Sequence, residues 1–565
     1  MERKRIIITL IFLSMFVAGT ILIFTVPIGV KASYYHVART YDGELISFNV
    51  FEPEGRETET KPAVIIGHGV IVNKEILKGY AIELALAGYV AVPFDFRGHG
   101  MSTGLLDIEK LPYDIAAIKT YLRSRGDIDM NKLAYIGYSM GGFPINEILK
   151  DNTDFRAFIG IGTGLTTHED KVVYANSSRY LNILMILAQY DEAFSLSELK
   201  EGVGIRLNMD PEDVVVNRLY GNFDDGNATE IFYDDNSDHL LTAWDQDFIR
   251  EARDWVMNTF PEIDPLDQHF YANIRALIFL MQIIGGIGLY FLIIEPISKL
   301  IIKNREEHED LLKDDTVKEM GKKTIIYSFL GIPGVAFMIP LLFAPLILGG
   351  AMAAVLFGQV FGVMLLLRKY FKKAGTSLWE QLKKPFKEPK KDLLRQIILG
   401  TILGVILYLI LYVSIGLNYL GMAPSVNKVL WIPLYLAVFI FIFLVFHLVF
   451  NILFDAKFGR TLKELIKSSL LAFGILTLYL TILILAFCIA VGNYFLLMVL
   501  VIAIPIYLLT VFTSALLFQK TGSIIPAAIA NTIFLVLLLA TLSPFGTPFT
   551  MLSMLGTVSE QIEVF

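Results

Sequence analysis

Two patterns of hydrophobic and polar positions divide the 565-residue chain. From about residue 272 onward, apolar runs of roughly twenty residues recur, and each is long enough to cross a bilayer. A further run follows the opening residues MERKR. About nine membrane spans are predicted, over residues 6–30, 274–298, 324–346, 347–368, 394–417, 430–454, 467–490, 493–517 and 524–544.

The stretch between the first and second spans has the pattern of a mixed soluble domain. HVARTYDGELISFNVFEP, which starts at His36, predicts a β-hairpin with its turn at Asp42-Gly43. Beyond it, helical patterns such as 74–87 and 113–123 alternate with continuous apolar runs, which are typical of parallel strands buried on both faces. These runs are 63–67, 89–93, 133–137, 157–161, 183–188 and 230–233. The alternation predicts a doubly wound, mostly parallel α/β sheet with an antiparallel hairpin at its edge.

The chain therefore divides into four predicted regions. Residues 1–30 form an N-terminal transmembrane anchor, and residues 31–268 form an extracytoplasmic α/β domain. Residues 269–545 form an all-α transmembrane domain of about eight spans, and residues 546–565 form an extracytoplasmic tail. The first apolar run is longer than that of a cleavable signal peptide, which favours an anchor, although VKA at 30–32 resembles a cleavage site.

Charge sets the expected orientation. The basic residues gather in three of the segments between spans, 303–323, 368–395 and 455–467, whereas the alternate segments are almost uncharged. The positive-inside rule then places the N-terminus in the cytoplasm, and the α/β domain and the C-terminus outside. The glycosylation-type sequons at Asn176 and Asn227 both fall in the α/β domain, in agreement. A formal net charge of −7 gives no indication of nucleic-acid binding.

Five polar clusters follow predicted strands, at the end of a doubly wound sheet where reactive groups lie. They are GHGV, DFRGHGMS, YSMGG, QYDEAF and DDNSDHLL. Within YIGYSMGG, Gly137-x-Ser139-x-Gly141 matches a nucleophile elbow, a strained strand-to-helix turn that exposes a serine, and a helical pattern follows. A serine hydroxyl needs a base to accept its proton, and the base needs an orienting acid.

The order Ser139, Asp191, His239 is the one expected for an elbow of this kind. His239 is the predicted base and Asp191 the orienting acid. The predicted oxyanion donors are the backbone N–H of Met140 and that of Val70 or its neighbour in HGV.

Other histidines and acidic residues are alternatives to His239 and Asp191. His36 and His168 precede Asp191, and His68 and His99 are on early loops where structural roles are common. Glu192 is adjacent to Asp191 and is an alternative acid. Three further carboxylates, Asp234, Asp235 and Asp238, lie close to His239 in sequence and are interpreted as solvated loop residues. No ligand pattern has metal-site spacing, so neither a metal nor a cofactor is predicted. The single cysteine, Cys488, is inside an apolar run and excludes a disulfide framework.

Five motifs together resemble the α/β-hydrolase superfamily, in particular its serine aminopeptidase-like and small esterase members. They are AVIIGHGV, VPFDFRGHGMSTG, YIGYSMGG, AQYDEAF and NSDHLL, between about residues 35 and 260. The resemblance implies a triad of Ser139, Asp191 and His239, and a largely structural role for the DFRGHGMS loop. Only about twenty residues separate the strands ending at 161 and starting at 183, so a large cap does not fit there, whereas 195–227 could supply a small one.

The membrane half offers few polar candidates within its spans: Gln282, Glu295, His447, Asn451 and Asn531. His447 and Asn451 share a helix face, which suits an interhelical hydrogen bond or a proton or ligand site. LLFQKTGSIIPAAIANTIFL is similar to the last motif region of the CAAX-protease and bacteriocin-processing membrane family. Those enzymes need a histidine at Asn531 and an asparagine at Leu535, and their paired glutamates are absent from the spans. The resemblance therefore implies that proteolytic chemistry has been lost, and it supplies no active site.

Two hypotheses follow from these observations. The first is a membrane-embedded serine hydrolase that cleaves ester or amide bonds on the outer face of the membrane. The second is a transporter- or receptor-like protein whose hydrolase-fold domain only binds a ligand. The complete Ser-Asp-His set favours the first. The expected partners are the lipid bilayer and a small-molecule, lipid or peptide substrate, among which the sequence does not choose.

Overall fold

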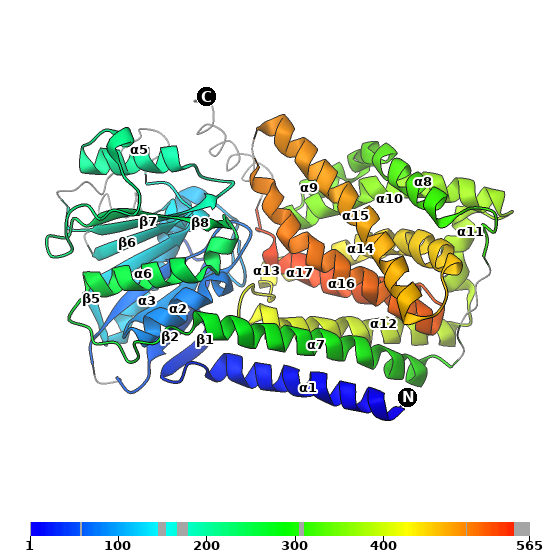
Figure 1. Ribbon diagram of the computed structural model, residues 1–565, viewed down its shortest axis with the longest axis horizontal. Helices are drawn as coiled ribbons and strands as arrows, with labels where there is room; N and C mark the ends of the chain where they lie inside the picture. The colour runs from blue at the N-terminus through cyan, green and yellow to red at the C-terminus, as the bar shows by residue number, and fades with distance from the viewer. Residues whose placement is uncertain are drawn as a thin grey trace. The chain divides into compact units, whose positions relative to one another are not determined.

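A computed structural model describes residues 2–56, 59–144, 154–165, 179–303, 305, 310–492 and 494–546 of the chain (Figure 1). The chain forms two compact units. The unit named here the sheet unit comprises Gly19–Leu280, Val413–Lys428 and Thr541–Phe565. The other, named the helical unit, comprises Met1–Ala18, Met281–Tyr412 and Val429–Ala540. Each unit therefore draws on segments that are far apart in the sequence.

An eight-stranded sheet in the order β1-β2-β4-β3-β5-β6-β7-β8 organises the sheet unit. The β1–β2 and β2–β4 pairs are antiparallel, and every pair from β4 through β8 is parallel. The strands are β1 Val30–Arg39, β2 Leu45–Pro53, β3 Lys61–Gly67, β4 Val90–Phe94, β5 Ile128–Tyr138, β6 Phe155–Ile161, β7 Asn182–Tyr190 and β8 Thr229–Asp238. The predicted α/β class and its antiparallel edge hairpin are confirmed.

The hairpin turn lies where the sequence predicts it. Arg39 pairs with Leu45, and the turn between them contains Gly43 at a φ of +98°, which a side chain would strain. Thr40 Oγ1 accepts from the backbone N–H of Glu44 at 2.9 Å and donates to Asp42 Oδ1 at 2.6 Å. Local side-chain hydrogen bonds thus fix the turn, and with it the register of the edge strand.

The central strands are buried on both faces, as their continuous apolar runs predict. Every residue of β3 and β4 is buried. Helices α2 Lys78–Leu86, α3 Leu111–Arg125 and α6 Gln246–Thr259 supply the cover. Helix α6 shows how: it buries one apolar stripe and leaves the opposite face polar. The stripe is Phe248, Ile249, Ala252, Trp255 and Val256.

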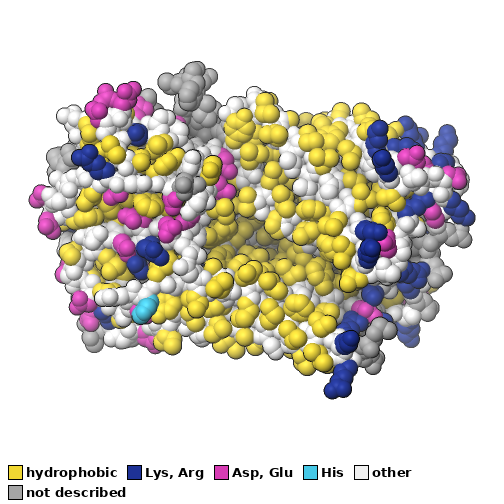
Figure 2. All heavy atoms as spheres, in the orientation of Figure 1, with side chains coloured by type: hydrophobic (Ala, Val, Ile, Leu, Met, Phe, Trp, Pro, Cys, Tyr) yellow, Lys and Arg dark blue, Asp and Glu magenta, His cyan; other side chains and the backbone are white. Residues whose placement is uncertain are grey.

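Helices dominate the other unit. In the described part of the chain, eight helices are long and apolar enough to cross a membrane, or nine if one bent pair counts as a single span. They are Arg3–Thr25, Ala272–Ile301, Ile347–Lys373, Lys390–Gly416, Ile432–Lys457, Leu462–Ala490, Phe495–Thr521 and Ile525–Leu542. Figure 2 shows a broad hydrophobic surface over this unit, with Lys and Arg side chains gathered at one end. These features are compatible with a multi-pass membrane protein.

The bent pair falls on the predicted span 324–346, which is therefore not one straight helix. Val317–Leu330 and Ile332–Leu342 meet at an angle of 50°. Pro333 cannot continue the hydrogen-bond ladder of the preceding turn. Gly331 also lies against the next helix, because a Cβ placed on it would be 2.2 Å from the carbonyl oxygen of Gly358. The break therefore has both a local and a packing cause.

Helix α1, Glu2–Thr25, packs on α7, Ala272–Ile301, within the helical unit. Glycines on α7 allow the close approach, since a Cβ on Gly285 would be 2.5 Å from the backbone nitrogen of Phe16. Near the start of α1, Arg5 pairs with Glu295 at 2.8 Å. The first span is thus packed against the second and not only tethered to it.

Candidate active site

The turn after β5 places Ser139 at the carboxyl end of the central parallel strands. Its φ is +52°, an uncommon conformation for a residue with a side chain. Glycines make room for it: a Cβ on Gly137 would lie 2.6 Å from the carbonyl oxygen of Gly141, and one on Gly141 would lie 2.4 Å from that of Gly67. Ser139–Gly142 forms a 3-10 turn. The helical pattern predicted beyond it falls partly on residues 145–153, outside the described residues.

Three residues from three strand ends meet at this turn. The hydroxyl of Ser139 lies 2.9 Å from Nε2 of His239, and Nδ1 of His239 lies 2.8 Å from Oδ2 of Asp191. The side chains of His239 and Asp191 are each 1% exposed, and Ser139 is 6% exposed. The structure therefore brings together the serine, base and acid that the sequence singles out, in a site largely closed to water.

The two adjacent acids have different partners. Oδ1 of Asp191 accepts hydrogen bonds from the backbone N–H groups of Ala193 and Phe194, both at 2.9 Å, which leaves Oδ2 for the imidazole. Glu192 Oε2 instead accepts from the backbone N–H of His239 at 3.1 Å. Asp191 orients the ring, and Glu192 holds the backbone of the same histidine.

The surroundings of His239 favour a charged ring. Burial alone would lower its pKa, but the Asp191 carboxylate, through its charge and its hydrogen bond, outweighs burial and raises the pKa above the ordinary value. Tyr138 and Phe194 stack on the ring at centroid distances of 5.5 and 6.0 Å. Stacking therefore fixes the orientation of the ring, and Asp191 favours its protonated form.

Gly162, which follows β6, is a site residue that the sequence reasoning missed. Its φ is +51°, and a Cβ placed on it would lie 2.9 Å from both Asp191 Oδ2 and His239 Nδ1. Its backbone N–H donates to the carbonyl oxygen of Ile186 at 2.9 Å. Any side chain at this position would press on the hydrogen bond between Asp191 and His239. The only signal in the sequence is a glycine directly after a buried strand.

The two predicted oxyanion donors lie on segments next to Ser139. Met140 follows it directly and is buried. The GHGV segment is adjacent, because a Cβ placed on Gly69 would lie 3.2 Å from Cβ of Ser139. Val70 itself is partly buried against the core of the sheet unit. The GHGV segment therefore lies beside the serine, as an oxyanion loop requires.

The early-loop histidines have structural partners. Phe96 donates its backbone N–H to Nε2 of His68 at 3.0 Å, so Nδ1 of His68 is the donor to the carbonyl oxygen of Gly69 at 2.6 Å. Nε2 of His99 lies 2.5 Å from the carbonyl oxygen of Val70. Burial lowers the pKa of His68 to about 4 and the pKa of His99 well below its usual range.

The remaining early histidines are not part of the site. His36 contacts Ser33 on β1, with its Nε2 at 2.8 Å from the hydroxyl oxygen. His168 is outside the described residues.

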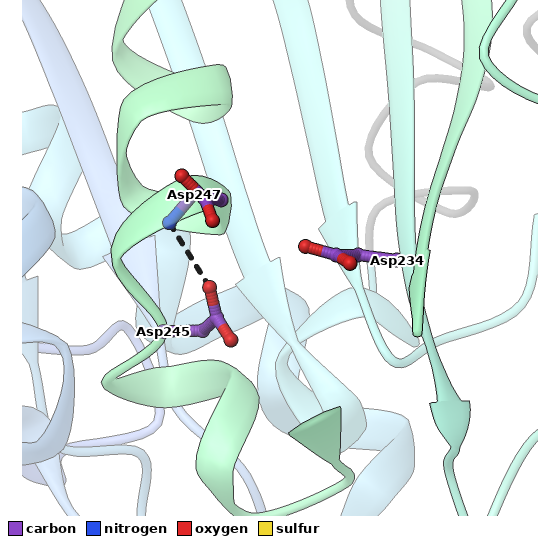
Figure 3. Close-up of side chains that lie close together, drawn as sticks. All are labelled: Asp234, Asp245 and Asp247. Atoms are coloured by element: carbon purple, nitrogen blue, oxygen red, sulfur yellow. Dashed lines mark hydrogen bonds between the residues drawn. The ribbon is translucent and has the colours of Figure 1, made fainter. Parts of the chain in front are cut away.

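Carboxylates around β8 form a separate cluster. Figure 3 shows Asp234, Asp245 and Asp247, whose oxygens lie within 4.8 Å of one another. Asp245 caps α6 by accepting from the backbone N–H of Asp247 at 3.0 Å, and it also accepts from the Ser237 hydroxyl. Asp238 accepts from the backbone N–H of Leu241 at 2.8 Å. Asp234 and Asp238 lie on β8 and are half-buried, so the interpretation of them as solvated loop residues is wrong, because the strand continues beyond the apolar run that predicted it. The side chain of Asp235 is outside the described set.

The predicted small cap maps onto α5, Leu196–Leu207, and the segment after it. Ser195 and Glu198 start this helix with a capping box, each side chain bonding the other's backbone N–H. Residues 166–178, the other possible place for a cap, are outside the described residues.

Polar residues within the spans are also placed. Glu295 pairs with Arg5, Lys299 and Lys520 at 2.8, 2.6 and 3.0 Å. Asn531 of α17, Ile525–Leu542, donates to the carbonyl oxygen of Thr510 at 3.1 Å and to the Ser514 hydroxyl at 2.7 Å, both on α16, Met498–Thr521. Both residues therefore hold helices together.

His447 and Asn451 lie at an irregular point of their helix. They sit where α14, Ile432–His447, passes into a π-helix, Leu448–Phe454, and Nδ2 of Asn451 donates to Asp455 Oδ2 at 3.2 Å. Among the described residues, His447 Nε2 and Asn451 Oδ1 are buried with no hydrogen-bond partner. His447, Asn451 and Asp455 line one cavity, and Asn451, Asp455 and Arg460 line an adjoining one of about 150 Å³. π-Helical turns are frequent at functional sites.

Comparison with known proteins points to the sheet unit. Residues 58–196 match the family model described as serine aminopeptidase, S33. Two uncharacterized proteins from strains of Mycobacterium tuberculosis are 30% identical over 80 residues, which is 14% of this chain and 28% of each relative. The match thus spans under a third of the length of those relatives.

Solved structures are similar at lower identity. An esterase from Pyrococcus furiosus is 17% identical, with 41% of this chain and 91% of that chain covered and a TM-score of 0.32. A protein described as a predicted CIB-like hydrolase from Thermoplasma acidophilum is 15% identical, with 41% and 100% covered and a TM-score of 0.31.

Proposed function

The chain carries an α/β-hydrolase domain of the serine aminopeptidase-like type, and from that premise we propose that it is a membrane-embedded serine hydrolase that cleaves ester or amide bonds. The observation that carries the proposal is the continuous hydrogen-bond chain Ser139–His239–Asp191, at 2.9 and 2.8 Å. Each of these residues follows a different strand, so it is the fold that brings the three hydrogen-bonded side chains together, and not their proximity in the sequence.

In the proposed reaction, Ser139 Oγ attacks the carbonyl carbon of the substrate while Nε2 of His239 takes the hydroxyl proton. Asp191 accepts from Nδ1–H throughout, which keeps the Nε2 lone pair directed at Ser139 and stabilises the imidazolium that forms. His239 then gives the proton to the departing alcohol or amine. Water repeats the sequence on the acyl-enzyme, which releases the acid and restores the serine.

The developing oxyanion needs two N–H donors on the side of the carbonyl away from His239. We assign the backbone N–H groups of Met140 and Val70 to this role, because one follows Ser139 directly and the other lies on the segment whose Gly69 approaches its Cβ. Losing one such donor typically reduces the rate by about 100- to 1000-fold.

We further propose that the helical unit spans the membrane, with the N-terminus in the cytoplasm and the hydrolase domain and C-terminal tail outside. The support is the alternation of basic and uncharged segments between the spans, together with the basic end of the helical unit (Figure 2). The proposed partners are the bilayer and an ester, peptide or lipid substrate on the outer side.

Turnover by the full-length protein in detergent tests the proposal. We expect hydrolysis of p-nitrophenyl butyrate or leucine p-nitroanilide, and a loss of at least about a thousandfold in Ser139→Ala and His239→Ala. Asn131→Ala, at an exposed position near the start of β5 and at the far end of that strand from Ser139, serves as the matched control and retains wild-type rates. Activity that persists in Ser139→Ala would assign the hydrolysis to another group or another protein.

One observation favours a second function, ligand binding by the helical unit. The half-buried Asp455 and the more exposed Arg460 line the same cavity of about 150 Å³, yet neither forms an ion pair with any residue in the described part of the chain. The buried Oδ1 of Asn451, without a partner there, belongs to a residue that lines the same space. Asp455 and Arg460 present opposite charges to this cavity, so we infer a small ligand that carries both charge signs, such as an α-amino acid.

Thermal unfolding of the full-length protein separates this function from the hydrolase. Leucine is expected to raise the melting temperature, whereas N-acetyl-leucine, without the ammonium, and leucinamide, without the carboxylate, do not. Asp455→Asn removes the effect, and Ser139→Ala leaves it unchanged. Equal shifts with all three compounds, or no shift with any, would contradict the assignment.

A further inference from the structure

The segment that joins α12, Lys390–Leu411, to α14 belongs to the sheet unit, although it begins in the last turn of one span and leads into the next. This segment, Val413–Lys428, is named here the 413–428 loop. Its Gly421 forms two hydrogen bonds with the side chain of Asn73: the backbone N–H donates to Oδ1 at 2.8 Å, and the carbonyl oxygen accepts from Nδ2 at 3.1 Å. Asn73 is 1% exposed, so this pair is closed to water.

The 413–428 loop contacts the hydrolase domain at two further points. The backbone N–H of Ser425 donates to the carbonyl oxygen of Gly100 at 3.0 Å. The ammonium of Lys78 donates to the carbonyl oxygen of Leu417 at 2.8 Å and to Oδ1 of Asn418 at 3.0 Å. The loop is thus attached mainly through its backbone groups, which find their hydrogen-bond partners on the hydrolase domain.

The segment after the last span also forms hydrogen bonds with the stretch around Gly100. Phe545 donates its backbone N–H to Gly98 at 2.7 Å and accepts from that of Leu106 at 2.7 Å. The buried ammonium of Lys428 donates to the carbonyl oxygen of Thr541 at 3.2 Å, which ties the 413–428 loop to the end of the last span. Both segments therefore hold the 97–106 stretch, the one that contains His99.

These attachments lie on either side of the proposed oxyanion donor. Asn73 is three residues beyond Val70 on the same loop. His99 precedes Gly100, and its Nε2–H donates to the carbonyl oxygen of Val70 at 2.5 Å. The segment itself is GHGV, in which two glycines provide no stiffness of their own. His68 within the segment holds the Gly69 carbonyl oxygen at 2.6 Å, and external contacts such as these fix the rest of its position beside Ser139.

We propose that Asn73 and His99 are positioning residues for the Val70 N–H, and that the 413–428 loop, supplied from between two spans, sets their position by binding Asn73 and Gly100. The inference rests on the proposed serine-hydrolase function. An oxyanion donor works only when it is held about 2.7–3.1 Å from where the charge develops, so small displacements of the GHGV segment matter. The hydrolase site is then complete only when the 413–428 loop is docked.

Two variants of the full-length protein break the same contact from opposite sides. Asn73→Ala removes both hydrogen bonds to Gly421. Gly421→Ala acts from the loop, outside the sequence of the hydrolase domain, because its Cβ would lie 2.7 Å from Nδ2 of Asn73. Asn182→Ala is the matched control. Asn182 is also a buried amide that binds backbone, with Oδ1 accepting from Ala228 at 3.1 Å, but it begins β7, at the far end of the strand from the site.

The readouts are p-nitrophenyl butyrate turnover, inhibition by phenylboronic acid and the melting temperature. Phenylboronic acid forms a tetrahedral anion on the serine and so reports on the oxyanion donors. Asn73→Ala and Gly421→Ala are expected to lower kcat about ten- to a hundredfold with a nearly unchanged KM. The boronate inhibition constant is expected to rise by the same factor as kcat falls. Asn182→Ala is expected to lower the melting temperature and to leave kcat and the inhibition constant unchanged.

The outcomes are separable. A lower melting temperature in Asn73→Ala and Gly421→Ala, with wild-type kcat and wild-type boronate inhibition, would overturn the positioning role and leave only a structural contact. If Asn73→Ala does not fold, Gly421→Ala decides by the same readouts. Wild-type turnover that does not depend on Ser139 would instead refute the proposed function itself.

Discussion

Replacing Asp191 by asparagine tests the proposed triad at the point where the structure gives the most detail. Oδ1 of Asp191 accepts from two backbone N–H groups at 2.9 Å, and in the variant these will select the oxygen of the introduced amide and turn its NH₂ toward Nδ1 of His239. Nδ1 must then accept, so the ring proton moves to Nε2, the atom that should take the proton of Ser139. The variant is folded but holds the base in the wrong tautomer.

The magnitude follows from the same hydrogen bonds. Turning the amide over would forfeit two of them, at about 1 kcal/mol each, so the productive orientation is disfavoured by about 2 kcal/mol. That corresponds to a loss of about thirtyfold in rate before the missing negative charge is counted. With the charge included, the equivalent change in other triads lowers kcat by about 10⁴-fold. We therefore expect Asp191→Asn to reduce kcat by between about thirtyfold and 10⁴-fold.

The assay is p-nitrophenyl ester turnover by full-length protein at about pH 7, with the melting temperature measured in parallel. Glu192→Gln is the matched control, because its side-chain oxygen can still accept from the backbone of His239, and its rate should change little. Asp191→Asn with more than about a third of the wild-type kcat would refute the tautomer reasoning. The reverse result, a large loss only in Glu192→Gln, would assign the acid to Glu192.

Three further predictions concern the same domain. First, kcat/KM should fall as the pH drops through the raised pKa of His239, because the base must be neutral; the acidic limb should therefore lie above the ordinary histidine value, and a limb below it would contradict the pairing with Asp191. Second, Gly162→Ala should lower kcat strongly, because the new Cβ would lie 2.9 Å from both Asp191 Oδ2 and His239 Nδ1 and would disturb the hydrogen bond between them. Wild-type turnover would show that the side chains can shift without loss of the hydrogen bond. Third, Asp95→Asn should destabilise the fold by about 3–5 kcal/mol in denaturant unfolding, since it removes the carboxylate that lies closest to the buried Lys74 ammonium; a change below about 1 kcal/mol would show that Lys74 is deprotonated or hydrated.

Much of the sheet could be predicted because its signals are local. The runs at 63–67 and 89–93 are apolar without interruption, and the strands they became, β3 and β4, are buried throughout. The Asp42-Gly43 turn is equally local, since side chains within a few residues fix it. The break in the span at 324–346 also had a local signal in Pro333, but the apolar run concealed it.

Other features of the site depend on contacts that no local pattern contains. Asp191 and Glu192 are neighbours of the same type, and only the loop that turns at Ala193 and Phe194 decides which of them faces His239. Gly162 matters because β6 ends beside a hydrogen bond formed by residues far along the chain. The pairing of Asn73 with Gly421 joins positions 348 residues apart, one in a soluble pattern and one between two spans.

The central claim is that Ser139 is an activated nucleophile in a domain on the outer face of the membrane. Labelling of intact cells with a membrane-impermeant fluorophosphonate, followed by the same labelling after lysis, tests it most directly. The account predicts that intact cells label the full-length protein and that Ser139→Ala abolishes the signal. Labelling only after lysis would contradict the orientation, and no labelling of folded protein in either preparation would contradict an activated serine.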